Sequence, residues 1–283
     1  MSVKMGRFGD QQAVPAIGQG TWYMGQSSAH RSQEAAALRA GVELGLTVID
    51  TAEMYADGGA EEVVGEAIRG LRDRVTLVSK VYPWHAGGHK MREACEASLR
   101  RLKSDYLDLY LLHWPGEFPL AETVEAMEAL VAQGKIRRWG VSNFDTDDMQ
   151  ALWQVPGGRR CATNQVLYHL ASRGIEYDLL PWCQQQLPVM AYSPLAQAGR
   201  LRDGLMNHPA LNGLAREKGV TVAQFLLAWI ISHKGVMAIP KAGSISHVKE
   251  NAAALEVVLD ENDIAVMEKA FPAPGRKTPL DMV

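Results

Sequence analysis

The stretch VTLVSKVYPWHAGGHKMREACEASLRRLKSDYLDLYLLH, residues 75–113, decides the fold. It begins with the apolar run Val75–Lys80 and ends with the apolar run Leu107–His113. Such runs are typical of strands that are covered on both faces of a sheet. Between them, Lys90–Leu102 repeats apolar side chains with a period of about 3.6, which predicts an amphipathic helix. A strand, a helix and another strand in this order predict a parallel sheet with right-handed crossovers.

The same alternation continues along the chain. Six further apolar runs predict strands, at Ile17–Trp22, Leu46–Asp50, Ile136–Ser142, Cys161–Tyr168, Pro188–Leu195 and Val236–Lys241. Helical patterns follow the strands, at Gln33–Leu44, Glu61–Ile68, Glu122–Val131, Thr146–Gln154, Glu176–Gln185, Val222–Ser232, His247–Leu255 and Asp260–Ala270. Eight strand–helix units in about 250 residues predict an α/β fold of the (β/α)8 TIM barrel type. Because no linker or compositional break divides residues 1–283, we expect a single domain.

Composition excludes several classes of protein. The chain has 283 residues, of which 47% are hydrophobic and 22% charged, so wholesale disorder is excluded. The net charge of −3 and the lack of a basic stripe argue against a nucleic-acid partner. No uncharged apolar run reaches the roughly 18 residues of a membrane span. Residues 1–10 lack the apolar core of a secretion signal. We therefore expect a cytoplasmic protein with buried or spectator thiols at Cys95, Cys161 and Cys183. We also expect a monomer.

Polar side chains stand at the ends of most predicted strands. In a TIM barrel, active sites lie at the carboxyl ends of the strands. The residues found there are Asp50, Lys80, His113, Ser142 with Asn143, Tyr192 with Ser193, and Lys241, while Gln165 lies within the sixth strand. Each residue alone has a simpler explanation, such as a helix cap or a packed histidine. Six such endings on one face indicate an active site.

Four of the polar residues suit carbonyl reduction. A tyrosine phenol has an ordinary pKa of about 10, and we expect the ammonium of Lys80 to lower the pKa of Tyr55. Asp50 would hold that ammonium, and His113 would donate a hydrogen bond to a carbonyl oxygen. The set predicts a proton donor beside a site that binds an electrophile.

Reduction also needs a hydride, which no side chain supplies, so we expect a nicotinamide cofactor. The stretch GQGTWY, residues 18–23, begins a dinucleotide fingerprint but has Tyr23 at the third glycine position. Another binding mode must then apply, with Tyr192 as the platform on which the nicotinamide stacks. The carboxamide of the nicotinamide would form hydrogen bonds with the side chains of Ser142, Asn143 and Gln165. Lys241 and Ser244 would bind phosphate at the start of the last barrel helix.

Several motifs in one order carry a family resemblance. They are GLTVIDTA (45–52) with EVVG (62–65), LKSDYLDL (102–109) with HWP (113–115), GVSNF (140–144), NQ (164–165), AYSPL (191–195), and IPK (239–241) through Glu250-Asn251. The sequence resembles the aldo-keto reductase superfamily. The resemblance implies NADPH bound across the top of a barrel and a catalytic tetrad of Asp50, Tyr55, Lys80 and His113, with Tyr55 as proton donor. The stretches 20–25 and 51–61 are most similar to methylglyoxal reductase-type members from enterobacteria.

The resemblance also implies a set of cofactor-binding residues: Thr21, Trp22, Ser142, Asn143, Gln165, Tyr192, Ser193, Leu195, Lys241, Ser244, His247, Glu250 and Asn251. Two positions depart from the family pattern. His247 stands where many members have an arginine on the 2′-phosphate, and Ala242 stands where a hydroxyl is frequent. Because neutral histidine is a weaker phosphate partner than arginine, we expect NADPH to be preferred and NADH to bind more weakly.

Aromatic residues after the strand ends predict the substrate pocket, with Trp22, Tyr23, Tyr82, Trp84 and Trp114 as its lining. For Trp84, simple loop packing is equally compatible with the sequence. The connections after His113 and Leu195 are short, and so is the tail after Phe271, which favours a small aldehyde or dicarbonyl such as methylglyoxal. The function predicted is reduction of such aldehydes to alcohols in detoxification.

Other readings are weaker. His85 and His89 have the spacing of a helical metal site, but Gly87-Gly88 lies between them and no carboxylate follows, so we expect no metal. A cofactor-sensing subunit with little turnover is an alternative, against which the intact tetrad argues. A cofactor-free barrel isomerase or aldolase leaves Ser142, Asn143, Gln165 and Tyr192 without a role.

Overall fold

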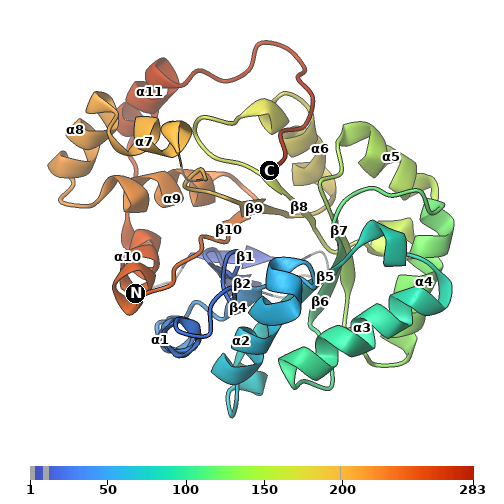
Figure 1. The fold of residues 1–283 in the computed structure, drawn as a ribbon. Coiled ribbons are helices and arrows are strands. Elements are labelled where there is room, and N and C mark those ends of the chain that lie inside the picture. The colour runs from blue at the N-terminus through green and yellow to red at the C-terminus, as the bar shows by residue number, and fades with distance from the viewer. Residues whose placement is uncertain (1–3, 9–12, 198) are drawn as a thin grey trace.

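The protein forms a closed barrel of parallel strands (Figure 1). The computed structural model describes residues 4–8, 13–197 and 199–283. Within these residues the sheet has eight strands in sequential order: β3 (Gln19–Gly20), β4 (Val48–Asp50), β5 (Thr76–Val81), β6 (Leu109–Leu112), β7 (Trp139–Ser142), β8 (Asn164–Leu167), β9 (Val189–Tyr192) and β10 (Val236–Ala238). The first and last strands close the barrel, because the N–H of Gly18 donates to the carbonyl of Ala238 at 2.8 Å. The predicted TIM barrel is confirmed.

Helices surround the barrel (Figure 1). Those that the sequence predicts are α1 (Arg31–Glu43), α2 (Gly59–Ala67), α3 (Gly88–Leu102), α4 (Leu120–Ala132), α5 (Thr146–Gln154), α6 (Leu179–Gln186), α9 (Val222–Ser232), α10 (Ile245–Ala253) and α11 (Glu261–Ala270). Short 3-10 turns are η1 (Tyr55–Gly58), η2 (Arg72–Arg74), η3 (Pro83–His85), η4 (Gly158–Arg160), η5 (Gly174–Glu176) and η6 (Ala254–Glu256). Side-chain caps fix several helix starts. Thr221, for example, accepts the N–H of Gln224 at 3.2 Å in a capping box before α9.

Two further helices stand between β9 and α9: α7 (Arg200–Met206) and α8 (Pro209–Glu217). They are an addition to the basic strand–helix plan and lie with α11 on one side of the barrel top (Figure 1). Neither helix was predicted, because both are short: α7 has 7 residues and contains Gly204, and α8 has 9 residues and begins at Pro209.

A hairpin of β1 (Met5–Arg7) and β2 (Ala13–Pro15) was also missed, since each strand has only 3 residues. The hairpin brings Phe8 into the barrel interior. This side chain is fully buried in a cluster with Val48, Leu109 and Met190. That end of the barrel is therefore filled by packed apolar side chains, and the hollow described below lies at the other end, where the strands finish.

The sequence also predicts that the chain has no membrane span and no secretion signal. Among the described residues, no helix has both the length and the apolar character to cross a membrane. The segment in which we expect no secretion signal, residues 1–10, lies partly outside the described residues, at positions 1–3, 9 and 10. The three cysteines are buried free thiols.

Candidate active site

The buried ammonium of Lys80 contacts two other members of the predicted tetrad, Asp50 and Tyr55. Lys80 lies on β5 with its side chain fully buried, and its Nζ lies 2.6 Å from Oδ2 of Asp50, at the end of β4. The same Nζ lies 3.0 Å from Oη of Tyr55 and donates to the carbonyl of Thr51 at 2.8 Å. Three oxygens thus surround the ammonium in place of water, which is the condition under which a charge of this kind can be buried.

The position of Tyr55 depends on an unusual turn. Directly after it, Ala56 and Asp57 have φ of +52°, and Gly58 has φ of +86°. These left-handed residues turn the chain from Tyr55 into α2, and the phenol itself is held by its contact with Lys80. Beneath the turn, the buried carboxylate of Glu61 accepts hydrogen bonds from Ser79 and from Arg101, both at 2.6 Å.

Burial dominates the electrostatics of Tyr55. Loss of water raises the pKa of the Tyr55 phenol, while the charge of Lys80 lowers it, and burial is the larger effect. Lys80 does act in the predicted direction, but the prediction that the pKa falls below its ordinary value is wrong, because the depth of burial of the phenol depends on the tertiary structure. For Lys80, burial lowers the pKa but the charges of Asp50 and Tyr55 outweigh it, so the group stays an ammonium.

His113 is a neutral imidazole beside the phenol. It follows β6, and its ring lies 5.8 Å from that of Tyr55, centroid to centroid, in an edge-on arrangement. Burial, with a further contribution from the charge of Lys80, lowers the pKa of His113 to about 2. Among the described residues its buried Nδ1 has no hydrogen-bond partner. The backbone carbonyl of His113 accepts from Nδ2 of Asn143 at 3.1 Å, which holds the two strand ends together.

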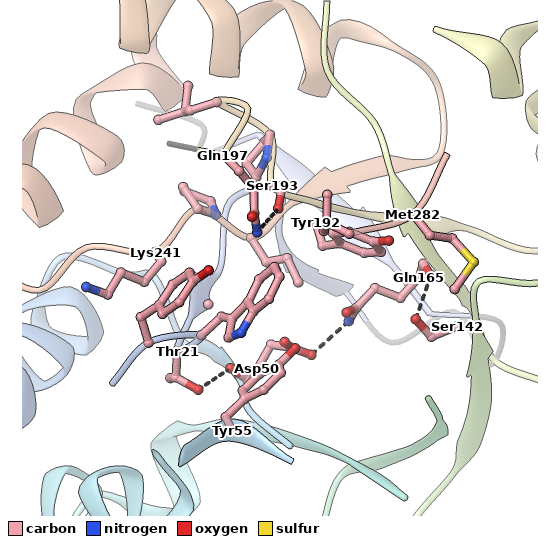
Figure 2. A pocket seen from close by; sticks show the side chains of 18 of the residues that line it. Thr21, Asp50, Tyr55, Ser142, Gln165, Tyr192, Ser193, Gln197, Lys241 and Met282 are labelled. Atoms are coloured by element: carbon pink, nitrogen blue, oxygen red, sulfur yellow. Dashed lines mark hydrogen bonds between the residues drawn. The ribbon is translucent and has the colours of Figure 1, made fainter. Parts of the chain in front are cut away.

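Tyr55 and His113 line a hollow of about 450 Å³. Figure 2 shows this hollow from close by, with Tyr55 among its labelled residues. Most of the residues predicted for the site line it: Thr21, Trp22, Tyr23, Asp50, Tyr55, His113, Trp114, Ser142, Asn143, Gln165, Tyr192, Ser193, Leu195 and Lys241. They come from all parts of the barrel sheet, as the strand-end argument predicted.

Hydrogen bonds organise the polar wall of this hollow. Nε2 of Gln165 donates to Oδ1 of Asp50 at 2.8 Å, and the hydroxyl of Ser142 donates to the carbonyl of Gln165 at 2.8 Å (Figure 2). The phenol of Tyr192 donates to Oδ1 of Asn143 at 2.8 Å, which fixes the Tyr192 ring. The amide of Asn143 is thereby engaged at both ends by the protein itself.

A second hollow, of about 490 Å³, adjoins the first and lies against α10. Predicted cofactor residues line it as well: Leu195, Lys241, His247, Glu250 and Asn251. The predicted residue Ser244 lines neither hollow. Its hydroxyl instead caps α10 by accepting a hydrogen bond from the N–H of His247 at 3.4 Å. One hollow thus offers a flat ring and amide groups, and the other offers cations, which fits a dinucleotide bound in an extended form.

Two predicted substrate residues lie away from the hollow. Tyr82 and Trp84 stack on each other at 4.3 Å and stand against Trp114 at 5.9 and 5.7 Å. They do not line the hollow above Tyr55. The reason is local: β5 ends at Val81, and the η3 turn directs the chain outward.

Other lining residues were not predicted, among them Arg202 of α7 and two residues of the tail, Met282 and Val283. The tail crosses back from α11 to the middle of the barrel (Figure 1). Lys277 anchors it by contacts to Asp145 at 2.6 Å and Asp178 at 2.8 Å. The short length of the tail had argued against a role in the pocket wall, and the contacts of Lys277 that hold it there depend on the tertiary structure.

Ionisable residues at the carboxyl ends of barrel strands, beside two connected hollows, define an enzyme of the TIM barrel class. Comparison of sequences makes the class specific: the chain belongs to the aldo/keto reductase family, whose model matches residues 16–271. Within the described residues, no group of three or more His, Cys, Asp and Glu side chains is placed to hold a metal ion.

Known relatives resemble the chain over most or all of its length. It is 68% identical to methylglyoxal reductase YeaE of Escherichia coli (strain K12), covering 100% of both proteins. It is 34% identical to a glyoxal reductase of Bacillus subtilis (strain 168), covering 81% of this chain and 80% of the relative. A crystal structure of an aldo/keto reductase from Klebsiella pneumoniae in complex with NADP and acetate is 71% identical, with a TM-score of 0.97 over 100% of both chains. A complex of a Klebsiella pneumoniae aldo-keto reductase with NADPH gives a TM-score of 0.98 at the same identity and coverage.

Proposed function

We propose that the protein reduces methylglyoxal and similar small aldehydes to alcohols with NADPH, with Tyr55 as the proton donor. The observation that carries the proposal is the 3.0 Å contact between Lys80 and Tyr55 at the base of the hollow. The names of the relatives support it, since one is a methylglyoxal reductase and a structural neighbour holds NADPH.

The protein's part in the reaction is to place the carbonyl and to supply a proton. When bound on Tyr192, the nicotinamide supplies the hydride that reduces the carbonyl carbon. Neutral His113 donates a hydrogen bond from Nε2 to the carbonyl oxygen, which polarises the carbonyl bond. Tyr55 then gives its proton to the same oxygen as negative charge develops there. Lys80 stabilises the phenolate that remains, and Asp50 holds Lys80 in position.

The walls of the hollow favour a small substrate. Trp22 stacks near Tyr55 on one side at 6.2 Å between ring centroids, and Trp114 lies 4.9 Å from His113 on the other. The tail residues Met282 and Val283 narrow the opening further. We expect these walls to admit a three-carbon dicarbonyl, whereas a bulky aldehyde would have to displace an aromatic ring or the tail.

We also propose that residues 1–283 act as one catalytic domain, monomeric and cytoplasmic, that removes reactive aldehydes. The family match over residues 16–271 supports a single unit, and the buried free cysteines are in keeping with a reducing compartment. Tyr82 and Trp84 stay proposed as an outer aromatic rim of the substrate site.

The experiment is a steady-state assay of NADPH consumption with methylglyoxal and a series of larger aldehydes, with the alcohol product identified. We expect the highest kcat/KM for methylglyoxal and other small dicarbonyls, and weaker activity with NADH. NADPH binding without consumption of any aldehyde in the series would contradict the proposal and favour a cofactor sensor.

A further inference from the structure

The junction between the two hollows is lined by three residues that belong to both: Leu195, Arg202 and Lys241. Two of the three are cations. Arg202 is half-buried on α7, and its Nη1 donates to the carbonyl of Leu195 at 2.9 Å. Among the described residues this carbonyl is its only hydrogen-bond partner, so most of the guanidinium donors are left for another acceptor.

The position of the junction indicates which acceptor would meet Arg202. The Tyr192 platform lies in the first hollow, and His247 and Asn251 line the second. A dinucleotide that spans both hollows must pass the junction with its middle, which is the pyrophosphate. We propose that Arg202, together with Lys241, binds the pyrophosphate of the cofactor. This inference rests on the proposed cofactor orientation and adds a binding residue to it.

The chemistry of the two cations fits a pyrophosphate. A guanidinium presents parallel N–H donors that match two phosphate oxygens, and an ammonium adds a compact point charge. Neither of the Asp and Glu side chains that line the hollows lies at the junction. Asp50 lines only the first hollow and is paired with Lys80 at 2.6 Å, and Glu250 lines only the second, where it accepts the hydroxyl of Thr221 at 2.5 Å. The charged side chains that the two hollows share are therefore the two cations.

The proposal separates Arg202 from the groups at the far end of the second hollow. Arg216 and His247 line only that hollow, where the 2′-phosphate that distinguishes NADPH from NADH would lie. The pyrophosphate is common to both cofactors. Arg202 should then contribute equally to the binding of NADPH and NADH, whereas His247 should affect the binding of NADPH alone.

The test is the dissociation constant of each cofactor, measured without aldehyde by quenching of tryptophan fluorescence. We expect Arg202→Ala to weaken NADPH and NADH by the same factor, roughly 10- to 100-fold, the usual effect of losing a hydrogen-bonded charge. Arg202→Lys keeps the charge and should weaken both less. Arg200→Ala is the matched control, since this exposed arginine of the same helix lines neither hollow and should change neither constant.

His247→Arg completes the comparison, because it should tighten NADPH and leave NADH unchanged. A loss on Arg202→Ala that is confined to NADPH would place Arg202 at the 2′-phosphate and overturn the proposal. A loss no larger than that of Arg200→Ala would also overturn it. Thermal unfolding of each variant shows whether the fold is intact.

Two cofactor fragments give a second readout. Adenosine 2′-phosphate lacks a pyrophosphate, and 2′-phospho-ADP-ribose contains one. Arg202→Ala should weaken only the second, and equal weakening of both would contradict the assignment. Since no aldehyde is present, failure of the proposed reduction would leave these results unaffected, and the two proposals can fail separately.

Discussion

At the scale of single residues, the ammonium of Lys80 connects the candidate catalytic groups, since it lies 2.6 Å from Asp50 and 3.0 Å from Tyr55. Asp50, Lys80 and His113 were predictable because each ends an apolar run, and the ends of parallel strands meet on one face. Tyr55 follows the second run by a few residues and was found through its fit to the chemistry and the family motif. The net direction of the Tyr55 pKa shift was not predictable. Burial raises this pKa and Lys80 lowers it, and the extent of burial depends on side chains from distant parts of the chain.

The pKa directions predict the pH dependence of reduction. The raised pKa of Tyr55 keeps the phenol protonated through neutral pH, and the pKa of about 2 at His113 keeps the imidazole neutral. The acid form of Tyr55 is the active one, so kcat should stay flat from weakly acidic to neutral pH and fall only at alkaline pH, above about 10. A kcat profile over pH checks this. A fall in kcat between weakly acidic and neutral pH would show that another group titrates.

At the scale of elements, the long helices and strands follow from periodicity, and the short ones do not. The predicted bounds of α5 and α9 agree with the structure at both ends. At their N-terminal ends the agreement follows from Asp145 and Thr221, which are strong capping residues. The helices α7 and α8 escaped prediction because they are short, and the tail escaped it because its position depends on tertiary contacts such as those of Lys277. Arg202 lies on α7 and was missed with that helix. Lys241 was therefore the one cation predicted for the middle of the cofactor site.

The η1 turn gives a prediction at this scale. Gly58 has φ of +86°, and a Cβ there would lie 2.6 Å from Cδ and Nε of Arg101. Gly58→Ala should lower the free energy of unfolding by about 1–3 kcal/mol through backbone strain, and should lower kcat because Arg101 and Glu61 support the Tyr55 turn. Urea unfolding and kcat measure the two effects.

Gly70→Ala is the control for this variant. Gly70 has φ of +76°, but a Cβ there meets nothing within 4 Å. It should show a comparable strain cost with an unchanged kcat. Equal kcat values for the two variants would mean that the turn does not position Tyr55.

At the scale of the whole molecule, the closed sheet brings residues distant in sequence into contact. Asp50 and Gln165 are 115 positions apart and share a hydrogen bond of 2.8 Å. Closure of β3 against β10 places Gly20 beside Lys241, which joins the first and last strands at the rim of the site. The alternation of strands and helices predicted this closure, whereas the size and connection of the two hollows depend on side-chain packing that no sequence pattern contains.

The central claim is that Tyr55 donates the proton to a carbonyl held beside Lys80 and His113. The most direct test is Tyr55→Phe, with kcat for methylglyoxal and the dissociation constant of NADPH measured on the same preparation. We predict a loss of roughly 10²–10⁴ in kcat, the usual contribution of a general acid, with NADPH binding unchanged because the Tyr192 platform does not depend on the Tyr55 hydroxyl. A kcat near that of the wild type would contradict the account.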